Sequence, residues 1–334
     1  MGIFASIDAG SNAVRLLVAR TGGGAPLARL RYERTTTRLA EGLPVSGSLK
    51  PRNMELTIEA MKRYYRIISS YEGLSGMRAV GTSALREAGN AGEFIRSVRQ
   101  QTGIELEAIT HEEEARLSAL GVVALLRNRE KTDGEAPGWN KDALILDMGG
   151  GSTEWMLVGG LASARDFSLK KSGSFPIGVV KLAVVEAERG EAALDNEISV
   201  FAGALRAAIF PLPPGTLFIL TGGTASAMAS IDLGIAQYEH ERVHGHEMGL
   251  ERLAAMHRKL SSLSLEQRRH SVPGLEPDRA DLIIPGLRLT IKIMEYFGLN
   301  RVISSDTGLP EGIILDLDNP DRKEKQKNGS GRPV

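Results

Sequence analysis

Asp147 and the glycine-rich stretch after it form the segment with the clearest chemical character. An apolar run over 144–146 ends at Asp147, three glycines and Ser152 follow, and a second apolar run begins at Trp155. Two β-prone runs joined by a short glycine turn predict a hairpin. Glycines allow the backbone to approach a ligand closely, and successive N–H groups form an anion-binding nest. Because a carboxylate beside such a nest can hold a hard cation, the segment predicts a cradle for metal-bound phosphate.

The N-terminal segment repeats this pattern. An apolar run ends at Asp8, small turn residues follow at 10–12, and an apolar run returns to Val18. Val18 lies ten positions after Asp8, and Val158 lies eleven positions after Asp147. Two hairpins of such similar length indicate an internal duplication rather than a short-period repeat.

A third glycine turn follows the apolar run 217–220 and contains Gly222 and Gly223. A helix is predicted to start there at Thr224, and such a helix start suits a phosphate or a nucleotide. A single Asp-Gly turn is common in ordinary hairpins, because both residues favour turns for backbone reasons. Three glycine turns, two of them led by an Asp, favour ligand binding over that interpretation.

Glu114 is a candidate catalytic base. A predicted helix begins at Thr110 and extends to about Arg127. Thr110 and Glu113 fit a capping box, and Glu112 suits the helix dipole as exposed first-turn charge. The positive helix end should keep Glu114 ionised, and an ionised carboxylate near phosphate can deprotonate a water. Spacing alone favours a purely structural role for Glu114.

Three histidines, His240, His244 and His246, lie among glutamates and raise the question of a metal site. They do not form a known compact ligand pattern such as H-E-x-x-H. A polar loop before a helix is therefore the preferred interpretation.

Other elements follow from hydrophobic periodicity and turn residues. The stretch 128–139 is polar with Gly and Pro, and predicts a loop near the main domain boundary. A helix over 279–297 is expected to bend at Pro285. A helix over 52–71 is predicted from apolar residues at intervals of three and four, namely Met54, Ile58, Met61, Tyr65 and Ile68.

Composition narrows the class of protein. The 334 residues suggest two domains, and 42% hydrophobic with 25% charged residues is typical of a soluble globular protein. A net charge of zero gives no sign of a nucleic-acid partner. The absence of cysteine excludes disulfides and thiolate chemistry. No apolar run is long enough to span a membrane, and no signal segment is recognised, so a cytoplasmic protein is expected.

Together these motifs resemble the exopolyphosphatase / guanosine pentaphosphate phosphohydrolase family, within the superfamily of sugar kinases, heat-shock ATPases and actin. The resemblance extends from about Ile3 to Leu317. It rests on the three glycine turns, on Glu113–Leu117 and on further short segments at 81–86, 176–178, 243–245 and 305–309.

The resemblance implies an α/β fold of two actin-like (ribonuclease H-like) domains with a central interdomain cleft that binds the phosphate chain. Domain I would span 1–127, completed by a C-terminal helix at about 306–318. Domain II would span 128–305. The polar tail 319–334 is predicted to be disordered.

It also implies roles for individual residues. Glu114 would activate the water. Asp147, with Asp8 and Glu154, would hold Mg²⁺ directly or through water, and a need for K⁺ is left open. Arg86 would bind phosphate with its guanidinium fork, with a surface salt bridge to Glu87 or Glu93 as the alternative. The full set expected to bind phosphate is Gly10, Ser11, Asn12, Ser83, Arg86, Gly149, Gly150, Gly151, Ser152, Gly222, Gly223 and Thr224.

Two departures from the family pattern stand out. Pro310 occupies a segment in which family members usually carry Arg, so a phosphate or interdomain contact is lost. The chain also ends soon after the last predicted helix, without the extra helical domains of longer members, and therefore corresponds to a short, two-domain form.

The predicted activity is Mg²⁺-dependent release of terminal phosphate from inorganic polyphosphate, with guanosine pentaphosphate as a further substrate. The alternatives are a guanosine pentaphosphate phosphohydrolase, a non-catalytic alarmone sensor, and an ATP-dependent small-molecule kinase of the same superfamily. The preference between polyphosphate and nucleotide, the chain length accepted and the oligomeric state stay open, with a homodimer as the family-level expectation.

Overall fold

The computed structural model describes residues 1–22, 25–133, 141–160 and 167–319. The chain forms two compact units: unit 1 comprises Met1–Gly121 with Leu309–Val334, and unit 2 comprises Val122–Gly308. The division made from the sequence has its first boundary after residue 127 and its second after residue 305. Most of the tail 319–334, predicted to be disordered, lies outside the described residues. No described helix is long and apolar enough to cross a membrane.

Unit 1 is built on a mixed sheet in the order β3-β2-β1-β4-β5. β1, β2 and β3 are antiparallel neighbours, whereas β4 is parallel to β1 and β5 is parallel to β4. The strands are β1 (Gly2–Ala9), β2 (Ala13–Gly22), β3 (Ala25–Thr36), β4 (Leu74–Gly81) and β5 (Leu106–Ala108). The helices are α1 (Leu43–Ser46), α2 (Pro51–Ser69), α3 (Ser83–Glu87), α4 (Ala91–Thr102), α5 (His111–Asp133), which continues into unit 2, and α13 (Leu309–Leu317).

Unit 2 repeats this topology. Its sheet has the order β8-β7-β6-β9-β11-β10, so β6, β7, β8, β9 and β11 take the places of β1 to β5, and β10 adds an antiparallel edge. The strands are β6 (Ala143–Met148), β7 (Thr153–Gly159), β8 (Ser168–Phe175), β9 (Leu217–Thr221), β10 (Glu247–Gly249) and β11 (Arg301–Ser305). The helices are α6 (Val179–Arg189), α7 (Glu191–Ile209), α8 (Gly223–Leu233), α9 (His240–Val243), α10 (Leu250–Ser261), α11 (Leu265–Ser271), the 3₁₀ turn Pro277–Arg279 and α12 (Ile283–Phe297).

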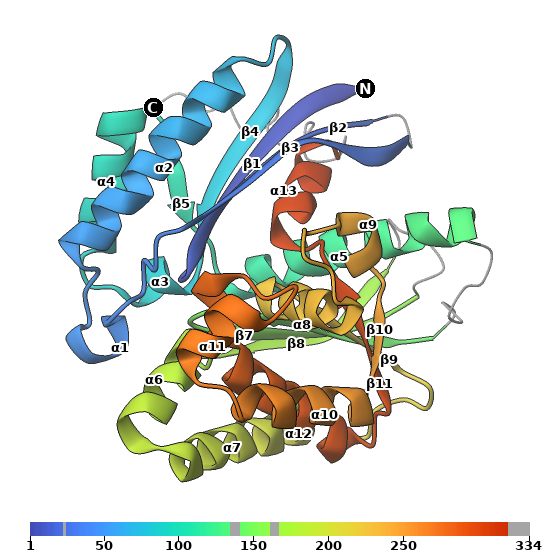
Figure 1. Cartoon of the computed structure of the whole chain (residues 1–334). Helices are drawn as coiled ribbons and strands as arrows, with labels where there is room; N and C mark the ends of the chain where they lie inside the picture. The colour runs from blue at the N-terminus through green and yellow to red at the C-terminus, as the bar shows by residue number, and fades with distance from the viewer. Residues whose placement is uncertain (23–24, 134–140, 161–166, 320–334) are drawn as a thin grey trace. The chain divides into compact units, whose positions relative to one another are not determined.

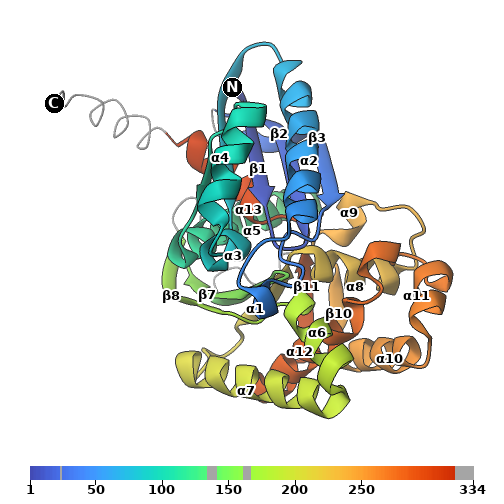
Figure 2. The ribbon, with the colours of Figure 1, turned by 90° about the vertical axis from the view of Figure 1, so that its left-hand side faces the viewer.

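The period-two alternation of β1 explains how the sheet of unit 1 is covered on both faces. Ala5 and Ile7 join the apolar cluster under α2 and α4, whereas Phe4 joins Ile314 of α13 on the opposite face. Figures 1 and 2 show α2 and α4 together on one face of this sheet and α13 on the other. A fully buried side chain of this size contributes about 1.5–3 kcal/mol, so α13 completes the core of unit 1 although it ends the described chain.

The expected α/β fold with two domains is confirmed, and several local predictions are wrong. In α2 the core side chain is Tyr64, which is 0% exposed, while Tyr65 is 44% exposed. Tyr64 can be buried because its hydroxyl donates to the Val14 carbonyl (3.1 Å). α5 continues past 127 to Asp133, where a loop was expected. α12 begins at Ile283, so Pro285 lies in its first turn, where proline is tolerated, rather than at a bend. The short helices α1 and α11 were not predicted.

Candidate active site

The first predicted turn joins β1 to β2, as expected. Asp8 is the penultimate residue of β1, and Gly10 N–H closes the turn on the Ala13 carbonyl (3.1 Å). A side chain at Gly10 would lie 3.2 Å from that carbonyl, tighter than an ordinary contact. The turn of unit 2 has the same closure, because Gly149 N–H donates to the Ser152 carbonyl (3.0 Å). The two hairpins are therefore alike in their hydrogen bonding as well as in their sequence.

Four of the predicted site residues meet in unit 1. The hydroxyls of Ser11 and Ser83 lie 2.8 Å apart and are buried. Three residues further along α3, Arg86 donates to the Glu114 carboxylate (Nη1 to Oε2, 2.6 Å) and to the Ile109 carbonyl (3.0 Å). Arg86 therefore pairs with the candidate base.

The three carboxylates in the first turn of α5 lie in different environments. Thr110 Oγ1 accepts from Glu113 N–H (3.2 Å), as a capping residue does, and the Glu113 carboxylate accepts from Arg78 (2.7 Å). Glu112 is exposed. The N–H at the helix end and the Thr110 hydroxyl lower the pKa of Glu112 by hydrogen bonding. Glu114 is the buried member, 6% exposed, and points toward Arg86.

The glycine loop after Asp147 is held from behind by α6. The N–H groups of Val179 and Val180 donate to the carbonyls of Gly149 and Gly150, each at 3.0 Å. Gly178 permits this approach, because a Cβ there would lie 2.4 Å from the Gly150 carbonyl carbon. The loop carbonyls are thus engaged, while the N–H groups of Gly150 and Gly151 donate to no described residue. This is the polarity of an anion-binding nest.

The two hairpins differ at one pair of equivalent positions. Asp8 is directly opposite Arg15 across β1 and β2, and the two side chains form an ion pair. Asp147 is directly opposite Glu154 across β6 and β7, with exposures of 8% and 1%. Ser174 Oγ donates to Glu154 (2.9 Å). Like charges that are directly opposite each other destabilise a strand pair, and a bound cation would offset this. Unit 2 therefore has carboxylate oxygens of the kind that bind a hard cation, whereas Asp8 of unit 1 contacts a guanidinium.

The third glycine turn packs on the second within unit 2. Gly222 has φ 90°, and a Cβ there would lie 3.0 Å from the Met148 carbonyl and 3.1 Å from Asp147 Oδ1. A Cβ at Gly223 would lie 2.0 Å from the guanidinium of Arg279. Arg279 also donates to Glu276 (2.8 Å). An arginine at a glycine turn and a helix start is a residue type that binds phosphate.

Arg279 was not predicted, because its segment has the character of an ordinary helix and no local pattern joins it to Gly223. The predicted Thr224 is buried at the start of α8.

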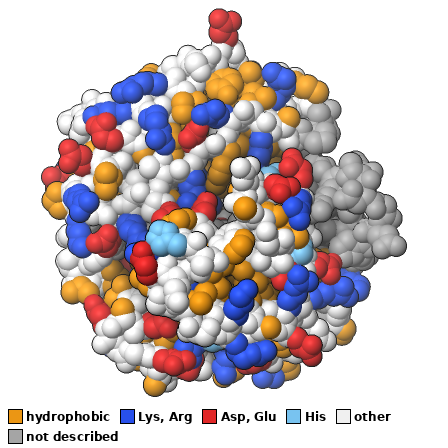
Figure 3. Space-filling model, in the orientation of Figure 1, with side chains coloured by type: hydrophobic (Ala, Val, Ile, Leu, Met, Phe, Trp, Pro, Cys, Tyr) orange, Lys and Arg blue, Asp and Glu red, His pale blue; other side chains and the backbone are white. Residues whose placement is uncertain are grey.

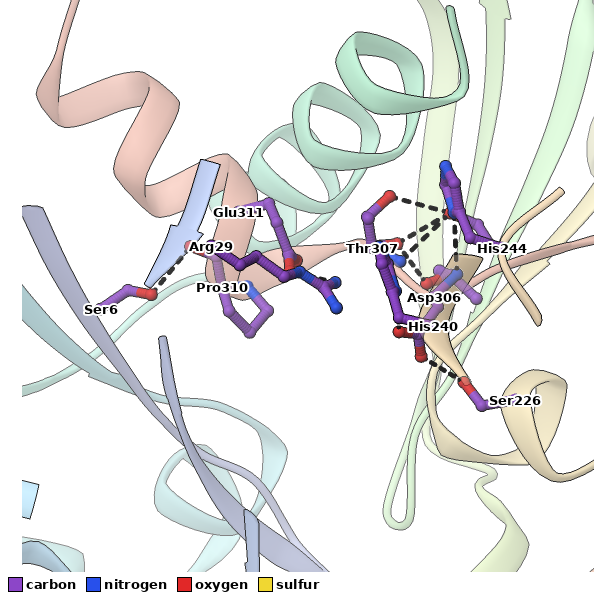
Figure 4. Close-up of polar contacts among 11 residues, drawn as sticks. Ser6, Arg29, Ser226, His240, His244, Asp306, Thr307, Pro310 and Glu311 are labelled. Atoms are coloured by element: carbon purple, nitrogen blue, oxygen red, sulfur yellow. Dashed lines mark hydrogen bonds and ion pairs between the residues drawn. The ribbon is translucent and has the colours of Figure 1, made fainter. Parts of the chain in front are cut away.

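The three histidines are each held by a hydrogen bond in unit 2, and Figure 4 shows two of them, His240 and His244. Asp306 binds His240 Nδ1 (2.5 Å) and accepts from Ser226 (2.8 Å), and its backbone N–H donates to His244 Nδ1 (3.2 Å). His246 Nε2 contacts Asp232 (2.7 Å). The expected polar loop is thus a hydrogen-bonded network around α9.

Pro310 occupies the first turn of α13 without disturbing it. Its carbonyl accepts from Ser6 (2.8 Å), and the buried Glu311 accepts from Arg29 (2.7 Å), both within unit 1 (Figure 4). On the face shown in Figure 3, acidic and basic side chains are interspersed, without a continuous field of one sign.

Comparisons with known proteins agree with this geometry. The Ppx/GppA phosphatase family matches residues 17–319. Exopolyphosphatase 1 of Mycobacterium tuberculosis is 26% identical over 318 residues, which cover 92% of this chain and 86% of that protein. A bifunctional 3-dehydroquinate synthase/phosphatase of Fusobacterium nucleatum is 26% identical over 93% of this chain, which spans only 46% of that protein.

Solved structures of Ppx/GppA and exopolyphosphatase-like proteins are also similar to this chain. An Aquifex aeolicus member of the Ppx/GppA family aligns with a TM-score of 0.74 at 26% identity, covering 94% of this chain and 97% of that one. An exopolyphosphatase-like protein aligns with a TM-score of 0.80 at 25% identity, covering 95% and 98% of the two chains. The expected actin-like fold class is thereby confirmed.

Proposed function

Because the chain belongs to the Ppx/GppA phosphatase family, we propose that it is an exopolyphosphatase that hydrolyses the terminal phosphoric anhydride of inorganic polyphosphate. Guanosine pentaphosphate, which offers the same anhydride at its end, is proposed as a second substrate. The name of the mycobacterial relative supports polyphosphate as the principal substrate.

The observation that carries the proposal is the buried contact between Arg86 and Glu114 beside the Ser11–Ser83 hydroxyl pair. Both carboxylate and guanidinium are nearly buried, with side-chain exposures of 8% and 14%. A carboxylate that only capped α5 would not need a buried arginine from α3, because Thr110 already provides the cap. The pair is suited to hold a water and a phosphate oxygen side by side.

Unit 2 would supply the cation. Asp147 and Glu154 provide the oxygen ligands that Mg²⁺ prefers, and their opposition across the strand pair fits a divalent ion. Mg²⁺ bound there would neutralise phosphate charge. We propose that Asp8 also binds the cation, through a water molecule, although Asp8 already forms an ion pair with Arg15.

The chain's own residues have separate roles in the proposed reaction. Glu114 orients a water and accepts its proton as the water oxygen attacks the terminal phosphorus. The anhydride P–O bond breaks, and the shortened phosphate chain leaves with the electron pair. Ser83 and Arg86 are proposed to bind phosphate oxygens, and the N–H groups of the loop after Asp147 are proposed to bind phosphate oxygens as well. Positioning and charge neutralisation account for most of phosphoryl-transfer catalysis.

Phosphate release measured with Mg²⁺ tests the proposal on short polyphosphate, long polyphosphate and guanosine pentaphosphate. Glu114→Gln is expected to lower kcat by roughly 10²–10⁴-fold with little change in substrate binding. Glu112→Gln is the matched control, because it removes an exposed carboxylate from the same helical turn and should retain full activity.

Each outcome has a distinct meaning. Release from the nucleotide alone would identify an alarmone phosphatase, and tight nucleotide binding without release would identify a sensor. ATP consumption without activity on polyphosphate would identify a kinase. Unchanged turnover by the Glu114→Gln protein would contradict the assignment of the base.

A further inference from the structure

The candidate base Glu114 extends from the first turn of α5, so its direction depends on how this helix is held. Glu113, Arg116 and Leu117 share a face of α5, because residues three and four positions apart are neighbours on a helix. Glu114 follows Glu113 by one position, which is about 100° around the helix axis, and it faces Arg86 instead. Contacts on the face that contains Glu113 therefore act on the rotation of α5 about its axis, and through it on the direction of Glu114.

α13 contacts this face through Asp316, a buried carboxylate. Its side chain is 8% exposed and accepts from the Arg116 guanidinium (Nη1 to Oδ1, 2.9 Å). The other oxygen of Asp316 lies 3.9 Å from Nη1 of Arg78. Arg78 of β4 is equally buried and donates through Nη2 to Glu113 (2.7 Å). One carboxylate of α13 therefore has a cationic partner on α5 and a second cationic neighbour that binds the first turn of α5.

The backbones of α13 and α5 also approach each other closely. A Cβ at Gly312 would lie 1.8 Å from the Leu117 carbonyl oxygen, so no side chain separates the two helices at this point. Leu117 and Ile109 belong to one apolar cluster with side chains of α13. The Ile109 carbonyl accepts from Nη1 of Arg86 (3.0 Å), and the same nitrogen donates to Glu114. A displacement of α13 would therefore act on both acceptors of this nitrogen.

The attachment of α13 to unit 1 does not depend on charged residues alone. Ile314 of α13 packs with Phe4 and Leu17 in one apolar cluster, and Leu309 and Ile313 belong to another. Replacing a buried ion pair by apolar residues of similar size is often neutral or stabilising, because burial removes both charges from water. A hydrogen bond adds direction, since it weakens steeply when donor and acceptor are misaligned. The buried carboxylate of α13 is therefore suited to fix an orientation.

We propose that Asp316 is a positioning residue: through its two arginine neighbours it fixes the first turn of α5, so that the Glu114 carboxylate faces the water it activates. This inference deepens the proposed function and rests on it. A misplacement of a catalytic group by about 1 Å can reduce the rate by roughly 100-fold. The proposed role of Asp316 is exerted through α5, without contact with the substrate.

The test measures kcat and KM for tripolyphosphate, the Kd by calorimetry and the Tm. Asp316→Ala is expected to lower kcat by about 10–100-fold with little change in Kd, because the phosphate-binding groups stay in place. Asp316→Asn keeps an acceptor for Arg116 and should retain more of the activity. Arg116→Ala removes the same hydrogen bond from an exposed side chain. It should also lower kcat, and it keeps the inference testable if the Asp316 variants do not fold.

The control for a loss of stability is Ile314→Val. This change weakens the packing of α13 in a cluster that contains no residue of α5. It should lower the Tm, because it removes a buried methyl group, and it should leave kcat unchanged when all assays are run well below the Tm of every variant.

A double variant separates positioning from a general loss of structure. Effects of residues that act as a unit are strongly non-additive. Once Glu114 is replaced by Gln, the direction of this side chain no longer matters for proton transfer. Asp316→Ala should then lower the residual kcat by less than about twofold.

The outcomes distinguish the inference from the proposed function. Unchanged kcat in Asp316→Ala and Arg116→Ala would overturn the inference and leave the proposed function intact. Equal losses of kcat from Asp316→Ala in the wild-type and Glu114→Gln proteins would also overturn it, because the effect would not pass through the base. A wild-type protein that releases no phosphate from tripolyphosphate or guanosine pentaphosphate would overturn the proposed function, and the inference with it.

Discussion

The opposed carboxylates of unit 2 lead to a quantitative prediction about stability. In an antiparallel pair, directly opposite residues have Cβ atoms roughly 5 Å apart. Pairs at this spacing change stability by about 0.2–1 kcal/mol, and like charges directly opposite each other are destabilising, so the repulsion between Asp147 and Glu154 is taken as up to about 1 kcal/mol. Replacing Glu154 by Gln removes this repulsion and keeps a group that can accept from Ser174. In the cation-free protein, Glu154→Gln should therefore stabilise unit 2.

Thermal unfolding in EDTA and in Mg²⁺ measures both sides of this prediction. In EDTA, Glu154→Gln should raise the Tm of unit 2 by up to about 2–4 °C, since 1 kcal/mol corresponds to about 2–4 °C for a unit of this size. In Mg²⁺ the wild-type Tm should rise, because the ion binds the folded state, and the variant should respond much less. Glu188→Gln changes the charge equally at an exposed position of α6 and should leave both values unchanged.

Two results would refute this reasoning. A lower Tm for Glu154→Gln in EDTA would show that the Glu154 carboxylate stabilises the cation-free unit, so that the pair is not a repulsive one. A wild-type Tm that is equal in EDTA and in saturating Mg²⁺ would show that the opposed carboxylates bind no ion in the folded state.

Two further predictions concern the core of unit 1. Gly312→Ala should destabilise the protein by about 3 kcal/mol in urea unfolding, because a Cβ at Gly312 would lie 1.8 Å from the Leu117 carbonyl. Gly203→Ala is the control, since Gly203 is a helical glycine with open space around its Cβ position, and it should be neutral or slightly stabilising. Similar losses of stability in the two variants would contradict the close contact between Gly312 and Leu117. Tyr64→Phe should cost about 1 kcal/mol through loss of the bond to Val14. Burial raises the pKa of Tyr64, so above about pH 10 the unfolded state loses this proton first and stability falls as pH rises. This fall in stability with pH should be shallower in Tyr64→Phe. Equal slopes of stability against pH in the two proteins would contradict this assignment to Tyr64.

The parts of the fold that could be predicted from the sequence are those with a local signal. The hairpin ending in Asp147 combines two apolar runs with a glycine turn, and each feature lies within fifteen residues. The repeat at Asp8 then indicates duplication without any tertiary information. The capping bond at Thr110 was likewise predictable, because it joins residues three positions apart.

The wrong predictions share a physical cause. Where two residues fit the local pattern equally well, contacts with residues distant in the sequence determine which of them is buried. Tyr64 and Tyr65 both fit a helical repeat, and the choice depends on Val14, which is fifty positions away. The contact of Arg279 with Gly223 has no local signature at all. The pairing of Arg15 with Asp8, by contrast, follows from strand register and could have been anticipated once the hairpin was predicted.

The placement of α13 has a consequence for biosynthesis. The last described helix covers the Phe4 side of the first sheet, so the N-terminal unit lacks part of its core until α13 has been translated. At about 5–20 residues per second, the intervening unit takes roughly 10–40 s to emerge. The continuous unit can fold on the ribosome during that time, while the unit that is made first must wait with an uncovered apolar face. Chaperone capture of nascent chains should therefore concentrate on the N-terminal sheet.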